Sequence, residues 1–166
     1  MNVVIVDDDP KDAEKINSVV EGYMEARKLD CMIDVYTDPE AFLGEMDERK
    51  SYDLFLLDIF MGKMDGRLLC QEILAKYIHP ICIFVTYSPE YAVECYKYST
   101  FRYVLKSNLE EQLCDALDAG VKLVKERKQN FRFLPLEVGS AIRYIIYEDI
   151  FYIEKDRKYV LIQVHD

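Results

Sequence analysis

The segment FLLDIFMGKMDG, residues 55–66, carries an apolar run directly into a lone aspartate, Asp58, and then into a glycine-containing loop. A short apolar run that stops at a turn is typical of a strand buried on both faces of a sheet. Asp58 therefore stands where such a strand is expected to end. What this carboxylate does depends on the residues at the ends of the other strands.

Five short apolar runs are expected to form strands: 3–6, 32–36, 54–57, 81–85 and 103–105. The segments between them carry apolar residues at helical spacing, and this alternation predicts an α/β fold with a doubly wound, five-stranded parallel sheet. The second run contains Asp34 and the fifth follows Arg102, whereas the other three are uninterrupted. The second and fifth strands are therefore expected at the edges, in the flavodoxin-like order 2-1-3-4-5.

Polar residues follow or close four of these strands. Asp7 and Asp8 follow the first, Asp58 the third and Lys106 the fifth, while Thr86 closes the fourth. In open α/β sheets ligands bind outside the carboxyl ends of the strands, next to the point where the strand order reverses. We therefore expect these five side chains to converge at one rim of the sheet.

Crowded carboxylates at such a rim favour a hard divalent cation, and Mg²⁺ prefers oxygen ligands. Asp8 and Asp58 would bind the metal directly, and Asp7 would reach it through water. The metal would polarise a phosphoryl group, and Asp58 would then act as its nucleophile. Lys106 would neutralise phosphoryl oxygens and Thr86 would donate a hydrogen bond to one of them. Each residue alone has a plainer explanation as a loop, cap or solvated residue, but the joint pattern favours phosphoryl transfer.

Four segments, IVDDDP, LLDIFMGKMDG, FVTYSPEYA and YVLKS, resemble the characteristic blocks of the response-regulator receiver domain of two-component signalling. The resemblance covers about residues 1–125. It implies that Asp58 is the phospho-acceptor of a sensor histidine kinase. It also implies that Asp7, Asp8 and Asp58 hold Mg²⁺ together with the backbone carbonyl of Phe60.

The same resemblance implies that Thr86 and Tyr103 form a switch pair, and that activation promotes a homodimer through the fourth helix, fifth strand and fifth helix. Two positions depart from the family pattern. Ser107 follows Lys106 where the family generally has a proline after a cis bond, so either a strained bond is kept or the lysine is placed differently. Tyr87 follows Thr86 where a small residue is common. Its ring would either restrict access to the site or lie as a half-exposed aromatic at the rim.

After a short linker expected at 126–130, residues 131–166 are rich in β-branched and aromatic residues. RYIIY, FYIE and YVLIQV are expected strands, with KDRK (155–158) as a turn. The stretch EDIFYIEKDRKYV resembles the start of a LytTR-type DNA-binding domain, so this tail is expected to be its truncated N-terminal part. The tail has five basic and six acidic residues. DNA binding is therefore expected only through a complete C-terminal domain.

Composition narrows the remaining function classes. The net charge of −10 disfavours a nucleic-acid surface over the whole chain, and the five cysteines lack CxxC spacing. No run is long enough for a membrane span, so a cytoplasmic protein without membrane contact is expected. The chain is expected to be a phospho-acceptor with at most slow self-dephosphorylation, rather than an enzyme. The alternatives are an unphosphorylated receiver-like interaction module and an aspartate-nucleophile phosphohydrolase; Phe60 disfavours the second, since those enzymes generally have an aspartate there.

Overall fold

The computed structural model divides the chain into two compact units, residues 1–121 and 122–166. The structure describes residues 1–46, 51–62, 64–77, 79–92, 100–130, 133–138, 141–156 and 159–164.

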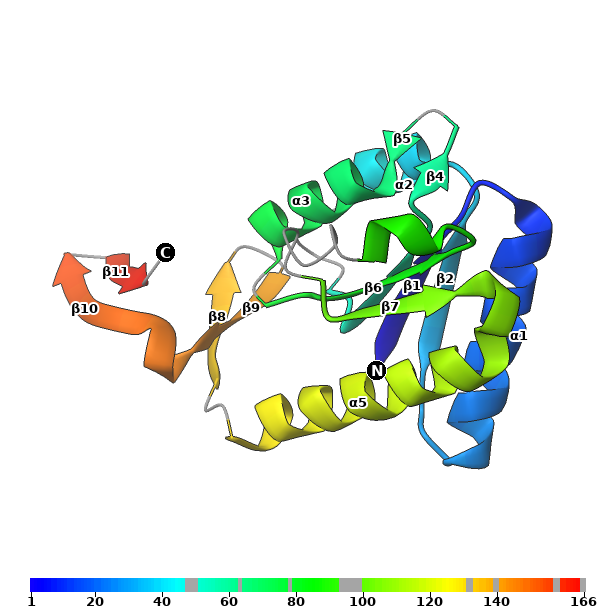
Figure 1. The fold of residues 1–166 in the computed structure, drawn as a ribbon. Coiled ribbons are helices and arrows are strands. Elements are labelled where there is room, and N and C mark those ends of the chain that lie inside the picture. Colours follow the sequence, from blue (N-terminus) through cyan, green and yellow to red (C-terminus); the bar gives the residue numbers. More distant parts are fainter. Residues whose placement is uncertain are drawn as a thin grey trace. The chain divides into compact units, whose positions relative to one another are not determined.

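The first unit is built on a five-stranded parallel sheet (Figure 1). The strands lie in the order β2-β1-β3-β6-β7, which confirms the predicted order and both edge strands. Every residue of β3 and β6 is buried, as expected for apolar strands covered on both faces. Their bounds are β1 Asn2–Val6, β2 Met32–Tyr36, β3 Leu54–Leu57, β6 Ile81–Thr86 and β7 Arg102–Leu105.

Helices cover both faces of this sheet. Helices α2 (Pro39–Glu45) and α3 (Gly66–Lys76) lie on one face, and α1 (Pro10–Ala26) and the first part of α5 (Leu109–Asn130) lie on the other (Figure 1). Phe42 of α2 and Leu69 of α3 pack in one apolar cluster with residues of β1, β3 and β6. Two 3₁₀ turns, η1 (Pro89–Tyr91) and η3 (Lys106–Asn108), follow β6 and β7. The sheet and its helices thus hold the strand ends in fixed positions.

The connection from β3 to α3 contains a short antiparallel pair, β4 (Phe60–Met61) and β5 (Met64–Asp65). Gly62 between them has a φ of +31°, a backbone conformation that residues with a Cβ rarely adopt. A Cβ at this position would lie 3.2 Å from Asp8 Oδ2. The loop after Asp58 therefore folds back closely beside the acidic residues that follow β1.

The second unit contains two antiparallel hairpins. The first pairs β8 (Phe133–Val138) with β9 (Ala141–Ile146); after a 3₁₀ turn, η4 (Tyr147–Asp149), the second pairs β10 (Ile150–Asp156) with β11 (Tyr159–Val164). The three predicted strands of the tail correspond to β9, β10 and β11, whereas β8 was not predicted. Residues 126–130, expected as a linker, form the last part of α5. The second half of the expected KDRK turn lies outside the described residues.

Candidate functional site

Three carboxylates meet at the carboxyl ends of β1 and β3, as predicted from the sequence. Asp7 and Asp8 follow β1 and Asp58 follows β3, and these two strands are neighbours in the sheet. One carboxylate oxygen from each residue lies within 4.8 Å of the other two. Asp7 is fully buried and Asp58 is 7 % exposed, whereas Asp8 is exposed. We call these three residues, Asp7, Asp8 and Asp58, the acidic cup, and Asp8 is its solvent-exposed member.

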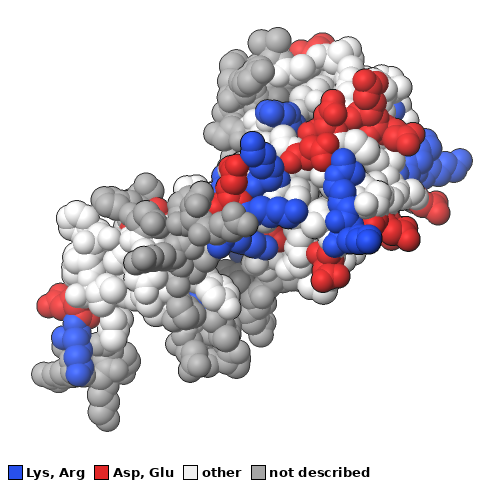
Figure 2. All heavy atoms as spheres, turned by 90° about the horizontal axis from the view of Figure 1, so that it is seen from below, with Lys and Arg blue, Asp and Glu red and all other residues white. Residues whose placement is uncertain are grey.

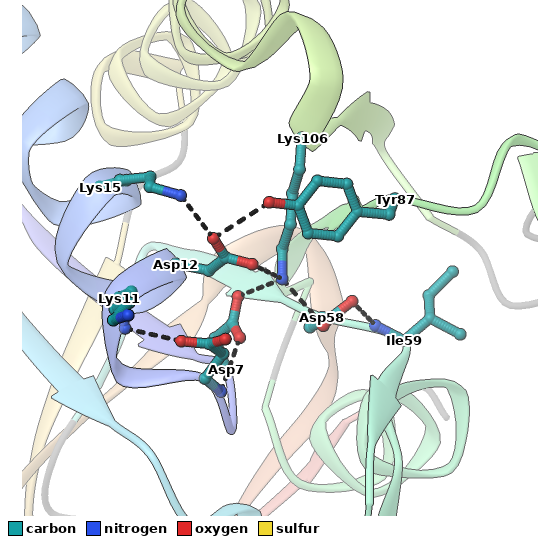
Figure 3. A network of polar contacts seen from close by, with 9 residues as sticks. Asp7, Lys11, Asp12, Lys15, Asp58, Ile59, Tyr87 and Lys106 are labelled. Carbon is teal, nitrogen blue, oxygen red and sulfur yellow. Dashed lines mark hydrogen bonds and ion pairs between the residues drawn. The ribbon is translucent and has the colours of Figure 1, made fainter.

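Lys106 is the main counter-charge of this cup. Its Nζ lies 2.7 Å from Asp7 Oδ2 and 2.9 Å from Asp58 Oδ2 (Figure 3). Its side chain is only 4 % exposed. Burial opposes its charge, yet the close contacts with the Asp7 and Asp58 carboxylates raise its pKa above the usual range. The described residues contain no cis peptide bond, so the bond between Lys106 and Ser107 is trans. The lysine side chain contacts Asp58 although no proline follows it.

Burial disfavours the charged form of Asp7. Burial raises its pKa to about 6, although the close contact with the charged Lys106 acts in the opposite direction. Its Oδ1 accepts a hydrogen bond from the Asp9 backbone N–H at 3.1 Å. Its buried Oδ2 accepts no hydrogen bond of full geometry and has only the ion pair with Lys106. An incompletely satisfied carboxylate oxygen is costly when buried, and a bound cation would relieve that cost.

The donor set of the cup fits a divalent metal. Its members are carboxylate oxygens, which are the ligands that Mg²⁺ prefers, and they converge from two adjacent strand ends. With the buried Oδ2 of Asp7 not fully satisfied, the residues have the charge and the spare ligand atoms for a cation. The arrangement of Asp7, Asp8 and Asp58 is typical of a magnesium site. Whether the carbonyl of Phe60 completes the ligand set stays a prediction.

Asp58 is held in a defined orientation. Its Oδ1 accepts a hydrogen bond from the Ile59 backbone N–H at 2.6 Å, and its Oδ2 contacts the ammonium of Lys106. Its own backbone N–H donates to the Val6 carbonyl at 2.9 Å, which fixes the start of the loop against β1. On the same loop the Phe60 side chain is 48 % exposed and its ring packs edge-on against Tyr91. An oriented carboxylate beside a cation is the arrangement that a nucleophile for phosphoryl groups requires.

Thr86 and Tyr103 lie on the adjacent strands β6 and β7. Thr86 is the last residue of β6 and is buried. Tyr103 is half-buried, lies opposite Phe84, and donates a hydrogen bond from its hydroxyl to the Ser88 carbonyl. The hydroxyl of Tyr103 thus ties β7 to the loop that follows Thr86. The role of the two residues as a switch pair stays a prediction.

Asp12 and Tyr87 complete the polar network, and neither is among the residues predicted to bind the metal or the phosphoryl group. Asp12, in the first turn of α1, places Oδ2 at 3.2 Å from Lys106 Nζ, and its Oδ1 accepts hydrogen bonds from the Tyr87 hydroxyl at 3.2 Å and from Lys15 Nζ at 3.0 Å. Burial acts against its charge, but the hydrogen bonds from Lys15, Lys106 and Tyr87 lower its pKa. The sequence gives an indication of this role. Asp12 is a charged residue on the buried, apolar side of α1, four residues before Ile16, where a charged side chain needs polar partners.

Comparison with known proteins places these residues in a family. The sequence matches the response regulator receiver domain over residues 3–118. The response regulatory domain of protein MrkE from Klebsiella pneumoniae, a solved structure, has a TM-score of 0.66 at 25 % identity and covers 76 % of this chain and 99 % of its own. The match thus spans most of the first unit and includes every predicted site residue.

Longer relatives extend the match through the tail. The positive alginate biosynthesis regulatory protein of Pseudomonas aeruginosa is 27 % identical over 98 % of this chain and 69 % of its own length. The sensory transduction protein LytT of Enterococcus faecalis is 23 % identical over 99 % of this chain and 69 % of its own. The alignment with such regulators runs on through the hairpins, as the resemblance to a LytTR-type regulator predicts.

The receiver prediction is thereby confirmed, together with the predicted sheet order and the meeting of the three carboxylates. The receiver-domain match covers more than half of the chain, which is enough to assign the chain to that family. The chain belongs to the response regulator receiver domain family and is a phospho-acceptor signalling domain rather than an enzyme.

Proposed function

We propose that the chain is the receiver part of a LytTR-type two-component response regulator, which accepts a phosphoryl group on Asp58 from a sensor histidine kinase in a Mg²⁺-dependent reaction. The observation that carries the proposal is the position of Asp58 within the acidic cup and beside a cation. Its Oδ2 lies 2.9 Å from Lys106 Nζ, and its carboxylate belongs to the cluster with Asp7 and Asp8. The proposed acceptor thus lies at the carboxyl end of the buried strand β3, beside the solvent-exposed Asp8.

In this reaction the phosphorus–nitrogen bond of a phosphohistidine breaks, and a phosphorus–oxygen bond to Asp58 forms. The histidine nitrogen leaves with the electron pair of the broken bond. Asp7, Asp8, Asp58 and the Phe60 carbonyl would hold a Mg²⁺ ion, which would neutralise phosphoryl charge. The hydrogen bond from the Ile59 N–H keeps the Asp58 carboxylate oriented, and Lys106 is positioned to bind a phosphoryl oxygen.

The new phosphoryl charge then biases a two-state element. In our proposal the Thr86 hydroxyl moves toward the phosphoryl group, and the Tyr103 ring turns inward. The Tyr103 bond to the Ser88 carbonyl is the contact that would change with the state of the site. Homodimerisation on activation is proposed on the same side of the sheet. Residues 93–99, in the segment between β6 and β7 where a fourth helix was expected, lie outside the described residues. Sedimentation with and without a phosphoryl mimic tests the proposal.

The output of the regulator is proposed to be DNA binding through a complete C-terminal domain. The chain spans 57–70 % of the length of its three first relatives, so those proteins extend further. Strands β10 and β11 expose the apolar residues Phe151, Ile153, Val160 and Leu161. In a complete domain, further strands of a sheet would cover such residues. On the face drawn in Figure 2, Lys and Arg are interspersed with Asp and Glu, which does not favour DNA binding by that face.

No helix among the described residues has the length and apolar character that a membrane crossing requires. The proposed regulator is expected to act in the cytoplasm, where histidine kinases place their catalytic parts and where DNA is found. This assignment rests on the proposed signalling role.

The test of the proposal is phosphorylation in vitro. The protein is incubated with a small phosphodonor with and without Mg²⁺, and its intact mass is measured. We expect a gain of one phosphoryl group that requires Mg²⁺ and is lost in Asp58→Asn. Asp115→Asn, at an exposed position of α5, is the control with the same loss of charge. An unchanged gain in Asp58→Asn would refute the assignment of the acceptor.

A further inference from the structure

Asp12 connects three elements around the candidate site. It lies in the first turn of α1, and its carboxylate contacts Lys106 from the end of β7 and Tyr87 from the end of β6 (Figure 3). Its side chain is only 10 % exposed, whereas its third partner, Lys15, is 62 % exposed. A carboxylate that is buried so far is costly unless its oxygens are paired. Two of its three partners belong to the rim of the site itself.

Three carboxylates share the ammonium of Lys106, two through hydrogen bonds and Asp7 through an ion pair. An ammonium group has three N–H donors, and Lys106 Nζ faces three carboxylate oxygens, at 2.7 Å from Asp7, 2.9 Å from Asp58 and 3.2 Å from Asp12. A phosphoryl oxygen on Asp58 would therefore compete with carboxylates that already contact Lys106. The contact with Asp12 is the longest of the three, so it is the one released first.

Tyr87 covers this ammonium on the solvent side. The centre of its ring lies 5.2 Å from Lys106 Nζ, and the tyrosine is 58 % exposed while the lysine is 4 % exposed. The hydroxyl of Tyr87 is anchored by Asp12 Oδ1 at 3.2 Å. A phosphodonor or a water molecule that approaches Lys106 from this side meets a ring whose far end is fixed to α1.

We propose that Asp12 is a positioning residue of the phosphoryl-transfer site, which competes with the phosphoryl group for Lys106 and holds Tyr87 as a gate across the approach to that lysine. The inference rests on the proposed function of Asp58. It assigns two separate effects to one carboxylate. Its Oδ2 weakens the hold of Lys106 on a phosphoryl oxygen, and its Oδ1 slows passage past Tyr87.

Two substitutions separate these effects. Asp12→Asn keeps an oxygen that can accept from Tyr87 but offers Lys106 no charge, so only the competition is removed. Tyr87→Phe keeps the ring but removes the hydroxyl, so only the anchor of the gate is lost. Asp115→Asn, on the exposed face of α5, controls for the loss of one negative charge. Circular dichroism on heating establishes that each variant is folded.

The first measurement is the affinity for beryllofluoride, a stable mimic of the phosphoryl group, at saturating Mg²⁺ by calorimetry. Asp12→Asn is expected to bind it about tenfold more tightly, the effect of one charged hydrogen bond. Asp115→Asn and Tyr87→Phe are expected to bind it as the wild type does. A purely structural role for Asp12 would not produce tighter binding, so equal or weaker binding by a folded Asp12→Asn variant would overturn the competition.

The second measurement follows the gain and the loss of the phosphoryl group by intact mass. A gate obstructs both the small phosphodonor and the hydrolytic water, so Tyr87→Phe is expected to gain phosphate from a small donor faster and to lose it to water faster. Unchanged rates would overturn the gate. This variant removes one hydroxyl only, so it tests the gate even if Asp12→Asn does not fold.

These outcomes are distinct from those of the proposed function. If the wild type gains no phosphoryl group, or if Asp58→Asn gains one, the proposed function fails and this inference fails with it. If phosphorylation depends on Asp58 while Asp12→Asn and Tyr87→Phe match the wild type, only the inference fails.

Discussion

The ammonium of Lys106 lies 2.9 Å from the Asp58 carboxylate, although 48 residues separate the two in the chain. Lys106 follows β7 and Asp58 follows β3, and β6 lies between these two strands in the sheet. The lysine side chain therefore reaches across a strand end to its partner. Because both groups are almost fully buried, their attraction is screened less by water than it would be at the surface.

The first prediction concerns this lysine. In Lys106→Met, Asp7, Asp12 and Asp58 lose their shared cation, and breaking a buried ion pair from one side typically costs about 3–5 kcal/mol. We expect unfolding in urea at neutral pH to show a loss of this size without Mg²⁺. Mg²⁺ is expected to bind this variant more tightly, because the competing positive charge is gone. Lys122→Met, at an exposed lysine of α5, is the control and should lose less than 1 kcal/mol, the usual limit for surface ion pairs.

The second prediction concerns the metal. Binding at about a hundred times the Kd stabilises the native state by about 2.7 kcal/mol, which for a domain of this size raises Tm by roughly 5–10 °C. We expect such a rise with Mg²⁺ in the wild type and little of it in Asp8→Ala, which removes the exposed wall of the acidic cup. Asp115→Ala should respond as the wild type does. An equal rise in Asp8→Ala would show that the metal binds elsewhere.

The third prediction is a pH dependence of Mg²⁺ affinity. Burial raises the pKa of Asp7 from 3.8 to about 6. The native state thus holds this proton more tightly than the unfolded chain does, so the contribution of Asp7 to stability is fully present below pH 4 and is lost as the pH rises through about 6. Mg²⁺ needs the carboxylate and competes with the proton. Its affinity should therefore be constant above about pH 7 and fall below pH 6, by up to about tenfold per unit.

Calorimetric Mg²⁺ titrations from pH 5 to 8 measure this dependence, and Asp7→Asn is its control. That variant should bind Mg²⁺ weakly at every pH and should lose the step near pH 6. A wild-type affinity that stays level down to pH 5 would rule out Asp7 as a participant in metal binding.

The fourth prediction concerns the close approach of α3 to the acceptor loop. A Cβ at Gly66 would lie 1.8 Å from the backbone carbonyl oxygen of Asp58, a distance at which atoms cannot coexist. Gly66→Ala must shift the loop, and we expect a loss of stability of about 1–3 kcal/mol or more, with slower phosphorylation. Gly22→Ala is the matched control, since nothing lies within 4 Å of its Cβ in α1 and alanine favours a helix by about 0.5–1 kcal/mol. Equal effects of the two substitutions would contradict the contact.

The strand ends were predictable because the core strands are uninterrupted apolar runs. LFLL and ICIFV have no polar interruption, and Asp58 and Thr86 stand where these runs end. The order of parallel strands then brings the residues at their ends together without further information. The polar edge residues Asp34 and Arg102 were enough to fix which strands lie at the edges.

Strand β8, the length of α5 and the role of Asp12 could not be predicted from the hydrophobic pattern alone. Strand β8 contains Pro135, and a proline counts against a strand unless it lies where no ladder hydrogen bond is needed, as at an edge. Residues 126–130 were expected to form a linker, but Glu, Arg, Lys and Gln are good helix formers and continue α5. Asp12 was passed over because its importance lies in contacts with Tyr87 and Lys106, 75 and 94 residues away.

The central claim is that Asp58 carries the phosphoryl group, and chemical mapping tests it most directly. The wild-type protein is phosphorylated in Mg²⁺ and treated with borohydride, which reduces an aspartyl phosphate to homoserine, and its peptides are sequenced by mass spectrometry. We predict homoserine at position 58 and unmodified aspartate at positions 7, 8 and 12. Homoserine at any of those three positions, with residue 58 unchanged, would contradict the account.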